Sequence, residues 1–233
     1  EDFYIMIIGI DTRIRSKNKT GIGYMISNIF PRLIEIDVYN NYVLFGNSLG
    51  VNSSRAKFFN LSRFFQRLSY LLLNKLPFLN INFFVGKTDI FIFPDFVVYP
   101  SSARKKILFV PDLSFIFYPQ FIEKRNLDFI NKKIVRSINK ADKVITISEN
   151  AKKEIISHYK VDPGKVEVVY LGCREDIKKI ESGTILNNIK KKYKINKEYI
   201  LYFGTLEPRK NINKLIEAYD LIPKKIRENY ILV

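Results

Sequence analysis

Residue types that support cysteine or histidine chemistry are almost missing from this 233-residue sequence. Cys173 is the single cysteine, so no disulfide can form within the chain and no metal cluster can be built on cysteines. His158 is the single histidine and lies in a segment with helical patterning, where it is either a catalytic base or a structural residue. These shortages argue against a Ser-His-Asp triad and against a multi-histidine metal site.

Long apolar runs are also lacking. No run reaches the roughly 18 residues that a transmembrane helix needs, and the N-terminus does not have the charged, apolar and small-residue order of a secretory leader. Together with the scarcity of cysteine, this pattern favours a reducing environment. We therefore expect a cytoplasmic protein, with any membrane contact peripheral and at the inner face of the cell membrane.

Acidic residues are in short supply: 23 against 39 basic ones, a formal net charge of +16. The excess reflects either the composition of the source or an anionic partner, such as a membrane surface, a nucleic acid or a phosphorylated substrate. No nucleic-acid recognition motif is present, so we expect no nucleic-acid partner.

The shortage is complete over residues 38–88, which contain no acidic residue. Within them, apolar residues recur at helical spacing at Phe58, Leu61, Phe65 and Leu68, which predicts a basic amphipathic helix over residues 55–75. Such a helix lies either on an anionic membrane surface or against a sheet. Its candidate membrane-surface residues are Arg55, Lys57, Arg63, Arg67 and Lys75.

Short apolar runs that alternate with helical patterns make up most of the chain. This alternation predicts an α/β fold with a Rossmann-like open parallel sheet covered on both faces. We place this first domain at residues 1–178, a linker at 179–188, and the start of a second, truncated Rossmann-like domain at 189–233. The expected strands are residues 3–10, 42–46, 90–93, 107–110, 144–147, 166–171 and 199–203, and the expected helices are 22–36, 123–140, 149–159 and 189–197.

The segment YILYFGTLEPRKNINKLIEA, residues 199–218, has the pattern strand, glycine turn, short loop and amphipathic helix. Arg209 and Lys210 are adjacent cations near the start of that helix, and Thr205 lies in the turn. Free backbone N–H groups and the helix dipole favour an anion there, so the loop predicts phosphate binding, with a solvated charged face as the alternative. No Asp-x-Asp triplet occurs, which argues against a diphosphate held through a divalent metal.

Two further loops follow predicted strands. Gly21 and Gly23 open the first helix and either approach a phosphate closely or form a flexible connection. Asp112 follows a strand end, where a carboxylate holds a hydroxyl, orients a loop or caps a helix. The glycine loop is crowded by basic residues, which supports an anionic ligand: Arg13, Arg15, Lys17 and Lys19.

The ordered set of motifs resembles one family. Residues 199–218 resemble the start of the C-terminal domain in group 1 (family 4) retaining glycosyltransferases of the GT-B fold, whose pattern there is close to Gly-Thr-x-x-Pro-Arg-Lys-Asn. Four earlier segments resemble the family's strands and loops in the same order: residues 8–11 with 20–23, 112–115 with 118–119, 141–149, and 168–172.

The resemblance implies two Rossmann-like domains, the first binding the acceptor and the second the nucleotide-sugar donor. Arg209 and Lys210 would neutralise the donor diphosphate in place of a metal, with Thr205 beside them, and Gly21 and Gly23 would approach it from the opposite wall. The donor would be a co-substrate, with no cofactor and no metal. The other partners would be a lipid-linked or polysaccharide acceptor and an anionic membrane surface.

Two departures from the family pattern matter. Pro111 stands where the family usually has a histidine that contacts the sugar, and the sequence stops before the family's Glu-x7-Glu segment. We therefore expect the 233 residues alone to be inactive. The function predicted is a retaining, metal-independent glycosyltransferase that moves a hexose, with mannose as the candidate, from a nucleotide sugar to a lipid-linked or polysaccharide acceptor at the membrane surface. The alternative is a non-catalytic, membrane-associated binding or scaffold protein on the same fold.

Overall fold

The computed structural model describes residues 4–13, 21–60, 68–69, 72–73, 79–173 and 177–233. The chain divides into two compact units, which are described separately. The first comprises Glu1–Phe117 and Lys124–Gly172, and the second comprises Tyr118–Glu123 and Cys173–Val233.

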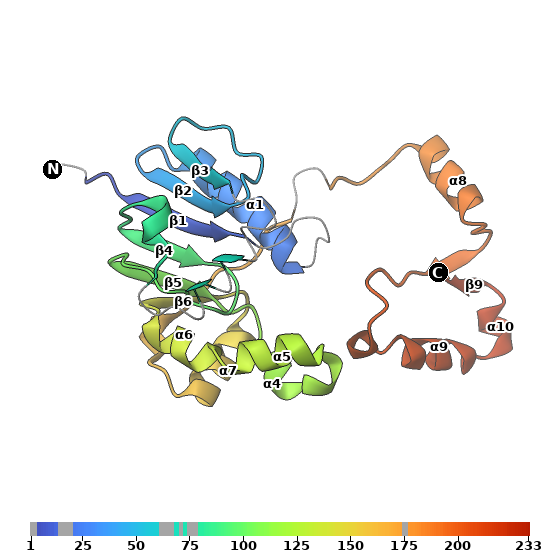
Figure 1. The fold of residues 1–233 in the computed structure, drawn as a ribbon. Helices are drawn as coiled ribbons and strands as arrows, with labels where there is room; N and C mark the ends of the chain where they lie inside the picture. The colour runs from blue at the N-terminus through green and yellow to red at the C-terminus, as the bar shows by residue number, and fades with distance from the viewer. Residues whose placement is uncertain (1–3, 14–20, 61–67, 70–71, 74–78, 174–176) are drawn as a thin grey trace. The chain divides into compact units, whose positions relative to one another are not determined.

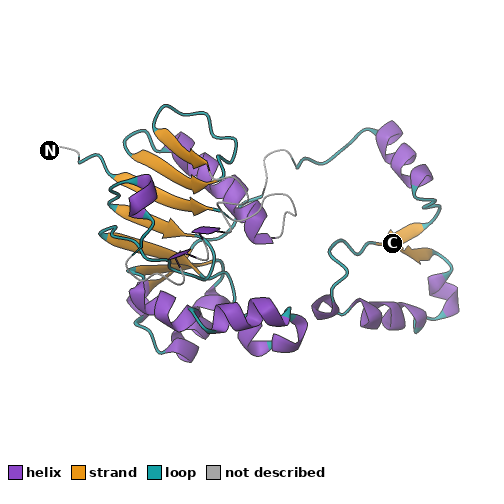
Figure 2. Ribbon diagram, in the orientation of Figure 1, coloured by secondary structure: helices purple, strands orange, loops and turns teal. Residues whose placement is uncertain are grey.

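The first unit is built on a seven-stranded sheet in the order β3-β2-β1-β4-β5-β6-β7, in which each neighbouring pair is parallel (Figures 1 and 2). The predicted Rossmann-like open parallel sheet is therefore confirmed. The strands are β1 (Ile7–Thr12), β2 (Asn41–Gly46), β3 (Ala56–Asn60), β4 (Ile90–Phe93), β5 (Lys105–Phe109), β6 (Lys143–Thr146) and β7 (Val166–Val168).

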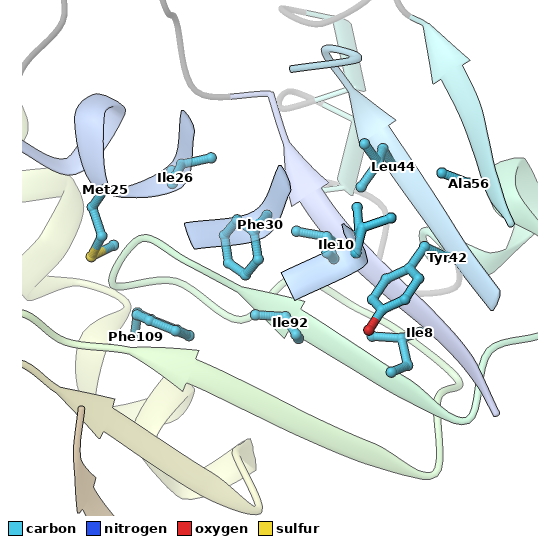
Figure 3. Close-up of a cluster of buried hydrophobic side chains, with 11 residues drawn as sticks. Ile8, Ile10, Met25, Ile26, Phe30, Tyr42, Leu44, Ala56, Ile92 and Phe109 are labelled. Atoms are coloured by element: carbon cyan, nitrogen blue, oxygen red, sulfur yellow. The ribbon is translucent and has the colours of Figure 1, made fainter. Parts of the chain in front are cut away.

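Helix α1 (Gly21–Ile36) covers one face of the sheet. Ile10 lies in register with Leu44 on one side and Ile92 on the other, which forms an apolar row across three strands. Phe30 of α1 faces this row, and its ring contacts Phe109 edge-on, with centroids 6.0 Å apart (Figure 3). Burial of these side chains is the main favourable contribution to folding, at about 25 cal/mol per Å² of apolar surface.

Alternate residues of the same strands bury the opposite face. Phe45 of β2 packs on Phe59 of β3 and on Phe84, with ring centroids 6.0 and 5.7 Å apart. Phe84 belongs to the short helix α3 (Asn82–Val85). Burial on both faces explains why these strands read as continuous apolar runs.

The helices after β5 differ in part from expectation. The predicted helix over residues 123–140 is two helices, α5 (Lys124–Asn131) and α6 (Ile134–Lys140), because the backbone of Lys133 leaves the helical region at φ −122°. Only α6 buries apolar side chains, so the two halves have different environments. The other elements of the first unit here are α4 (Ser114–Phe117), α7 (Glu149–Tyr159) and η2 (Pro163–Lys165), whereas η1 (Pro119–Phe121) belongs to the second unit.

Helix α7 confirms the predicted helix over residues 149–159. Ser148 is its N-cap, and the Ser148 hydroxyl accepts a hydrogen bond of 3.1 Å from the backbone N–H of Ala151. The helix ends at Lys160, which adopts the left-handed conformation at φ 54°.

The predicted amphipathic helix over residues 55–75 is wrong at its start. Residues Ala56–Asn60 form β3, in which Phe58 pairs with Leu44 of β2. A β-strand is favoured there because partner residues on β2, distant in sequence, supply its hydrogen bonds. Residues 68–69 and 72–73 are helical, and the rest of the predicted helix lies outside the described residues.

The second unit contains a parallel β-α-β element, in which β8 (Glu198–Ile200) and β9 (Tyr230–Leu232) pair and α9 (Ile212–Asp220) lies between them in sequence. The predicted linker at 179–188 is partly helical, because α8 spans Gly183–Lys192. Gly183 is the first residue of this helix and Ser182 is its N-cap, so the two residues do not form a flexible connection. The remaining elements are η3 (Pro208–Lys210) and α10 (Lys224–Arg227).

Candidate functional site

The carboxyl ends of β1, β4 and β5 lie along one edge of the first unit's sheet. From β1 the chain continues to β2 on one side, and it later returns to β4 on the other side of β1. In open parallel sheets, ligands bind beyond the carboxyl ends of the strands at the point where the strand order reverses. The residues that follow β1, β4 and β5 are therefore the candidate site of this unit.

Arg13, which follows β1, is a buried and fully engaged cation. Its guanidinium holds the carboxylate of Asp11 through two hydrogen bonds, Nε to Oδ1 at 2.8 Å and Nη2 to Oδ2 at 2.6 Å. It also donates to the Ser69 hydroxyl at 3.1 Å and lies over the rings of Phe45 and Tyr99. Arg13 thus neutralises an internal carboxylate, which corrects its predicted support of an anionic ligand. Arg15, Lys17 and Lys19 lie outside the described residues.

Gly21 and Gly23 form the first turn of α1, as the sequence predicts for a helix that opens here. Gly21 is exposed, and a Cβ on it would meet no atom within 4 Å, whereas Gly23 is buried. The first turn contains no acidic residue, so its backbone N–H groups offer positive potential without a competing carboxylate. This arrangement can bind an anion, but diphosphate binding by Gly21 and Gly23 stays a prediction.

Asp112, just beyond β5, caps a helix. Its carboxylate accepts a hydrogen bond of 2.9 Å from the backbone N–H of Ser114, the first residue of α4. Its neighbour Pro111 is buried, and the Pro111 carbonyl accepts a hydrogen bond of 3.2 Å from the hydroxyl of Thr146 at the end of β6. The structure thus shows the capping role of Asp112, and a role in chemistry stays a prediction.

Asp95, two residues beyond β4, is a candidate that the sequence analysis missed. Burial, together with the negative charge of Asp11, raises the pKa of the Asp95 carboxyl to about 6. The next residue, Phe96, has φ +40°, which is uncommon for an aromatic residue. The signal in the sequence was an aspartate that follows an apolar run and a proline, a pattern that Asp112 shares.

His158 is exposed on α7, and its ring contacts Phe117 edge-on, with centroids 6.3 Å apart. Phe117 is the last residue of α4. This contact gives the histidine a packing role, in line with the structural alternative.

The basic residues near β3 have mixed roles. The guanidinium of Arg55 donates to the carbonyls of Asp37 and Ile34, the latter at 3.2 Å, and so caps the C-terminal end of α1. Lys57 is exposed on β3. The other predicted membrane-surface residues, Arg63, Arg67 and Lys75, lie outside the described residues.

In the second unit, the predicted phosphate-binding loop contains a carboxylate of its own, that of Glu207. Arg209 Nε donates to Glu207 Oε2 at 2.6 Å. A hydrogen bond from Thr205 and this contact with Arg209 lower the pKa of Glu207. Among the described residues, no hydrogen bond or ion pair of the Lys210 ammonium is seen. Asn211, in the left-handed conformation, then begins α9, so both cations lie directly before that helix.

The described part of the chain contains neither a membrane-spanning helix nor a cluster of metal-ligating side chains. No helix there is both long and apolar enough to cross a membrane. No group of three or more histidine, cysteine, aspartate or glutamate residues is placed there to hold a metal ion.

The sequence of the first unit matches a known protein family. The family model of Glycosyltransferase Family 4 matches residues 60–176, about half of the chain. The chain belongs to Glycosyltransferase Family 4. The matched region includes Asp95, Pro111 and Asp112, so the carboxyl ends of β4 and β5 fall within it.

Curated relatives include sugar transferases. The chain is 28% identical over 140 residues to the O-antigen chain mannosyltransferase B of Escherichia coli, which covers 60% of this chain and 36% of the relative. It is 31% identical over 106 residues to the serotype-specific mannosyltransferase WbdA of Escherichia coli, covering 45% of this chain and 13% of the relative. The matched part therefore spans about a third or less of the length of these relatives.

Solved structures show the same fold. The complex of Anabaena Alr3699/HepE with UDP and glucose superposes with a TM-score of 0.60 at 14% identity, covering 98% of this chain and 60% of that one. The UDP-glucose complex of the same protein gives a TM-score of 0.59 at 14% identity, with 97% and 59% covered. The fold is that of the GT-B glycosyltransferases.

Proposed function

We propose that this family 4 chain is part of a retaining, metal-independent glycosyltransferase that moves a hexose from a nucleotide sugar to a lipid-linked or polysaccharide acceptor. The single observation that carries the proposal is the family match over the carboxyl ends of β4 and β5, the edge at which α/β sheets bind ligands. The mannosyltransferases among its relatives support mannose as the hexose and a polysaccharide as the acceptor.

In this proposal the first unit binds the acceptor and the loop before α9 binds the donor. Arg209 and Lys210 neutralise the charge that grows on the departing diphosphate, in place of a metal ion. Arg209 is held by Glu207, so its guanidinium is already oriented, while the Lys210 ammonium can turn toward a phosphate. Gly21 and Gly23 supply backbone N–H groups at the start of α1.

The donor role is tested by removing both charges in the whole protein. We expect Arg209→Ala with Lys210→Ala to weaken binding of a mannose nucleotide at least tenfold in calorimetric titration, because charge-assisted contacts to phosphate are lost. The matched control is Lys224→Ala with Lys225→Ala, which removes the same charge from α10 of the same unit. Equal affinity of the two double variants would contradict the assignment.

The reaction itself is tested by product analysis. We expect transfer to continue in excess EDTA, and the anomeric configuration of the donor to be retained in the product by NMR. Loss of transfer in EDTA, restored by a divalent cation, would contradict metal independence. An inverted product would contradict the retaining mechanism.

A non-catalytic binding or scaffold protein is the second candidate. Pro111 favours it, because proline offers no side-chain hydrogen bond where the family usually has histidine, and its carbonyl is already bonded to Thr146. The two candidates separate in one assay of the whole protein. A scaffold binds the nucleotide sugar without transferring or hydrolysing it, whereas an enzyme turns it over.

Peripheral attachment to the cytoplasmic face of the membrane is proposed from the net charge of +16. Co-sedimentation with anionic vesicles at low salt, lost at high salt, is the expected result. No retention on anionic vesicles at low salt would contradict the proposal.

A further inference from the structure

The carboxyl end of β4 is placed where the strand order of the sheet reverses. β4 pairs with β1 from Ile8 opposite Ile90 to Ile10 opposite Ile92, so the two strands end side by side. Asp95 follows β4, and its carboxyl is close enough to Asp11 of β1 for the charge of Asp11 to act on it. A carboxylate at the end of β1 and one from the segment after β4 therefore lie on the same edge of the sheet.

The two carboxylates, Asp11 and Asp95, differ in whether they have an ion-pair partner. Asp11 is neutralised by the guanidinium of Arg13. For the carboxyl of Asp95, no hydrogen bond or ion pair is seen with any residue in the described ranges. Neighbouring groups crowd Asp95, but the residue keeps some exposure to solvent. An unpaired carboxylate in such surroundings destabilises the fold, as its raised pKa shows.

The backbone beside Asp95 is strained and firmly held. Phe96 has φ +40°, and its N–H donates to the carbonyl of Phe109 at 3.1 Å. Its ring packs edge-on against Phe115 of α4, with centroids 5.4 Å apart. Contacts from β5 and α4 thus fix the peptide that follows Asp95. Backbone strain and an unpaired carboxylate both lower the stability of the fold, and features of this kind cluster at functional sites.

We propose that the Asp95 carboxylate accepts hydrogen bonds from hydroxyl groups of the acceptor sugar, and so selects acceptors that carry those hydroxyls. The proposal rests on the proposed function. A carboxylate has only acceptor positions, and sugar hydroxyls are the donors that match it. A site that buries such a partner discriminates strongly against an acceptor without the hydroxyl, because the carboxylate is then left unpaired.

The test compares Asp95→Asn with Asp142→Asn in the whole protein, using octyl mannoside as the acceptor. Asp142 precedes β6, at the opposite edge of the sheet, and pairs on the surface with Lys105. We expect Asp95→Asn to raise the acceptor KM at least tenfold and to leave the dissociation constant of the mannose nucleotide unchanged. Asp142→Asn should change neither quantity.

Direct binding of octyl mannoside, followed by saturation-transfer NMR, gives a readout that does not need turnover. Weaker binding to Asp95→Asn than to the wild type supports the role. If the wild type and Asp95→Asn transfer with the same acceptor KM, the role of Asp95 is overturned but the proposed function is not. The same holds if Asp95→Asn loses affinity for the mannose nucleotide as much as for the acceptor. A wild-type protein that neither binds nor glycosylates octyl mannoside or a mannose disaccharide would overturn the proposed function and this inference with it.

Discussion

Asp11 and Arg13, two residues apart at the end of β1, form a buried ion pair held by two hydrogen bonds of 2.8 and 2.6 Å. The side chain of Arg13 is fully buried and that of Asp11 is 6% exposed. A buried pair of this kind gains little net stability, but breaking it leaves an uncompensated charge inside the protein. The pair therefore sets the local charge at the edge of the sheet where ligands are expected.

Arg13→Ala should destabilise the first unit strongly. It leaves Asp11 buried without its partner and removes the contact with Ser69, at a cost of about 3–5 kcal/mol in the free energy of unfolding. The control is Arg32→Ala, which breaks an exposed pair with Glu35 and should cost about 1 kcal/mol or less. Urea unfolding followed by circular dichroism measures both, and equal midpoints would contradict the internal role of Arg13.

Gly46→Ala should also destabilise the protein. Gly46 has φ +129°, and a Cβ there would lie 2.6 Å from the backbone nitrogen of Arg13. Since backbone cannot move aside easily, we expect a loss of about 1–3 kcal/mol, measured by thermal unfolding. Gly172→Ala is the control, because the space around Gly172 is open. A Gly46→Ala protein as stable as this control would show that β2 and the segment after β1 can separate.

The ionisation of Asp37 makes the free energy of unfolding depend on pH in the acidic range. Burial opposes its ionisation, but hydrogen bonds from the Tyr42 hydroxyl, the Asn40 amide and two backbone N–H groups outweigh it and hold the pKa of Asp37 well below its usual range. A carboxyl whose folded-state pKa is lowered contributes stability above its unfolded pKa of about 3.9 and loses it as the pH falls further. Tyr42→Phe should therefore cost about 1.5–3 kcal/mol at pH 7 and less at pH 3. A pH-independent cost in urea unfolding would count against this linkage.

Asp95 has the opposite linkage. Its folded-state pKa of about 6 lies above the unfolded value, so the folded state binds the proton more tightly. Ionisation of Asp95 should thus lower the free energy of unfolding as the pH rises from about 4 to above 6. Asp95→Asn should be more stable than the wild type by about 1–3 kcal/mol at pH 7, with the gap closing near pH 4. A gap that is absent at pH 7 would show that the carboxylate has an internal partner in solution.

Local patterns in the sequence were enough to predict several elements. Continuous apolar runs mark strands such as β4 because both faces of the sheet are covered, which leaves little room for polar residues. The helix over residues 149–159 and the cation pair before α9 were also predictable, because the groups that define them lie within a few residues of one another.

Other features depend on residues that are far apart in the chain, and only the tertiary structure decided them. Residues 56–60 are a strand because β2 is beside them, although their apolar spacing also suits a helix. Arg13 is internal because Asp11, Ser69 and Tyr99, which come from separate parts of the chain, surround its guanidinium. Local sequence patterns therefore predicted the fold class, and the resemblance of its motifs predicted the family. Long-range packing determined which of the charged residues at the edge of the sheet are paired inside the protein, because their partners lie on separate elements.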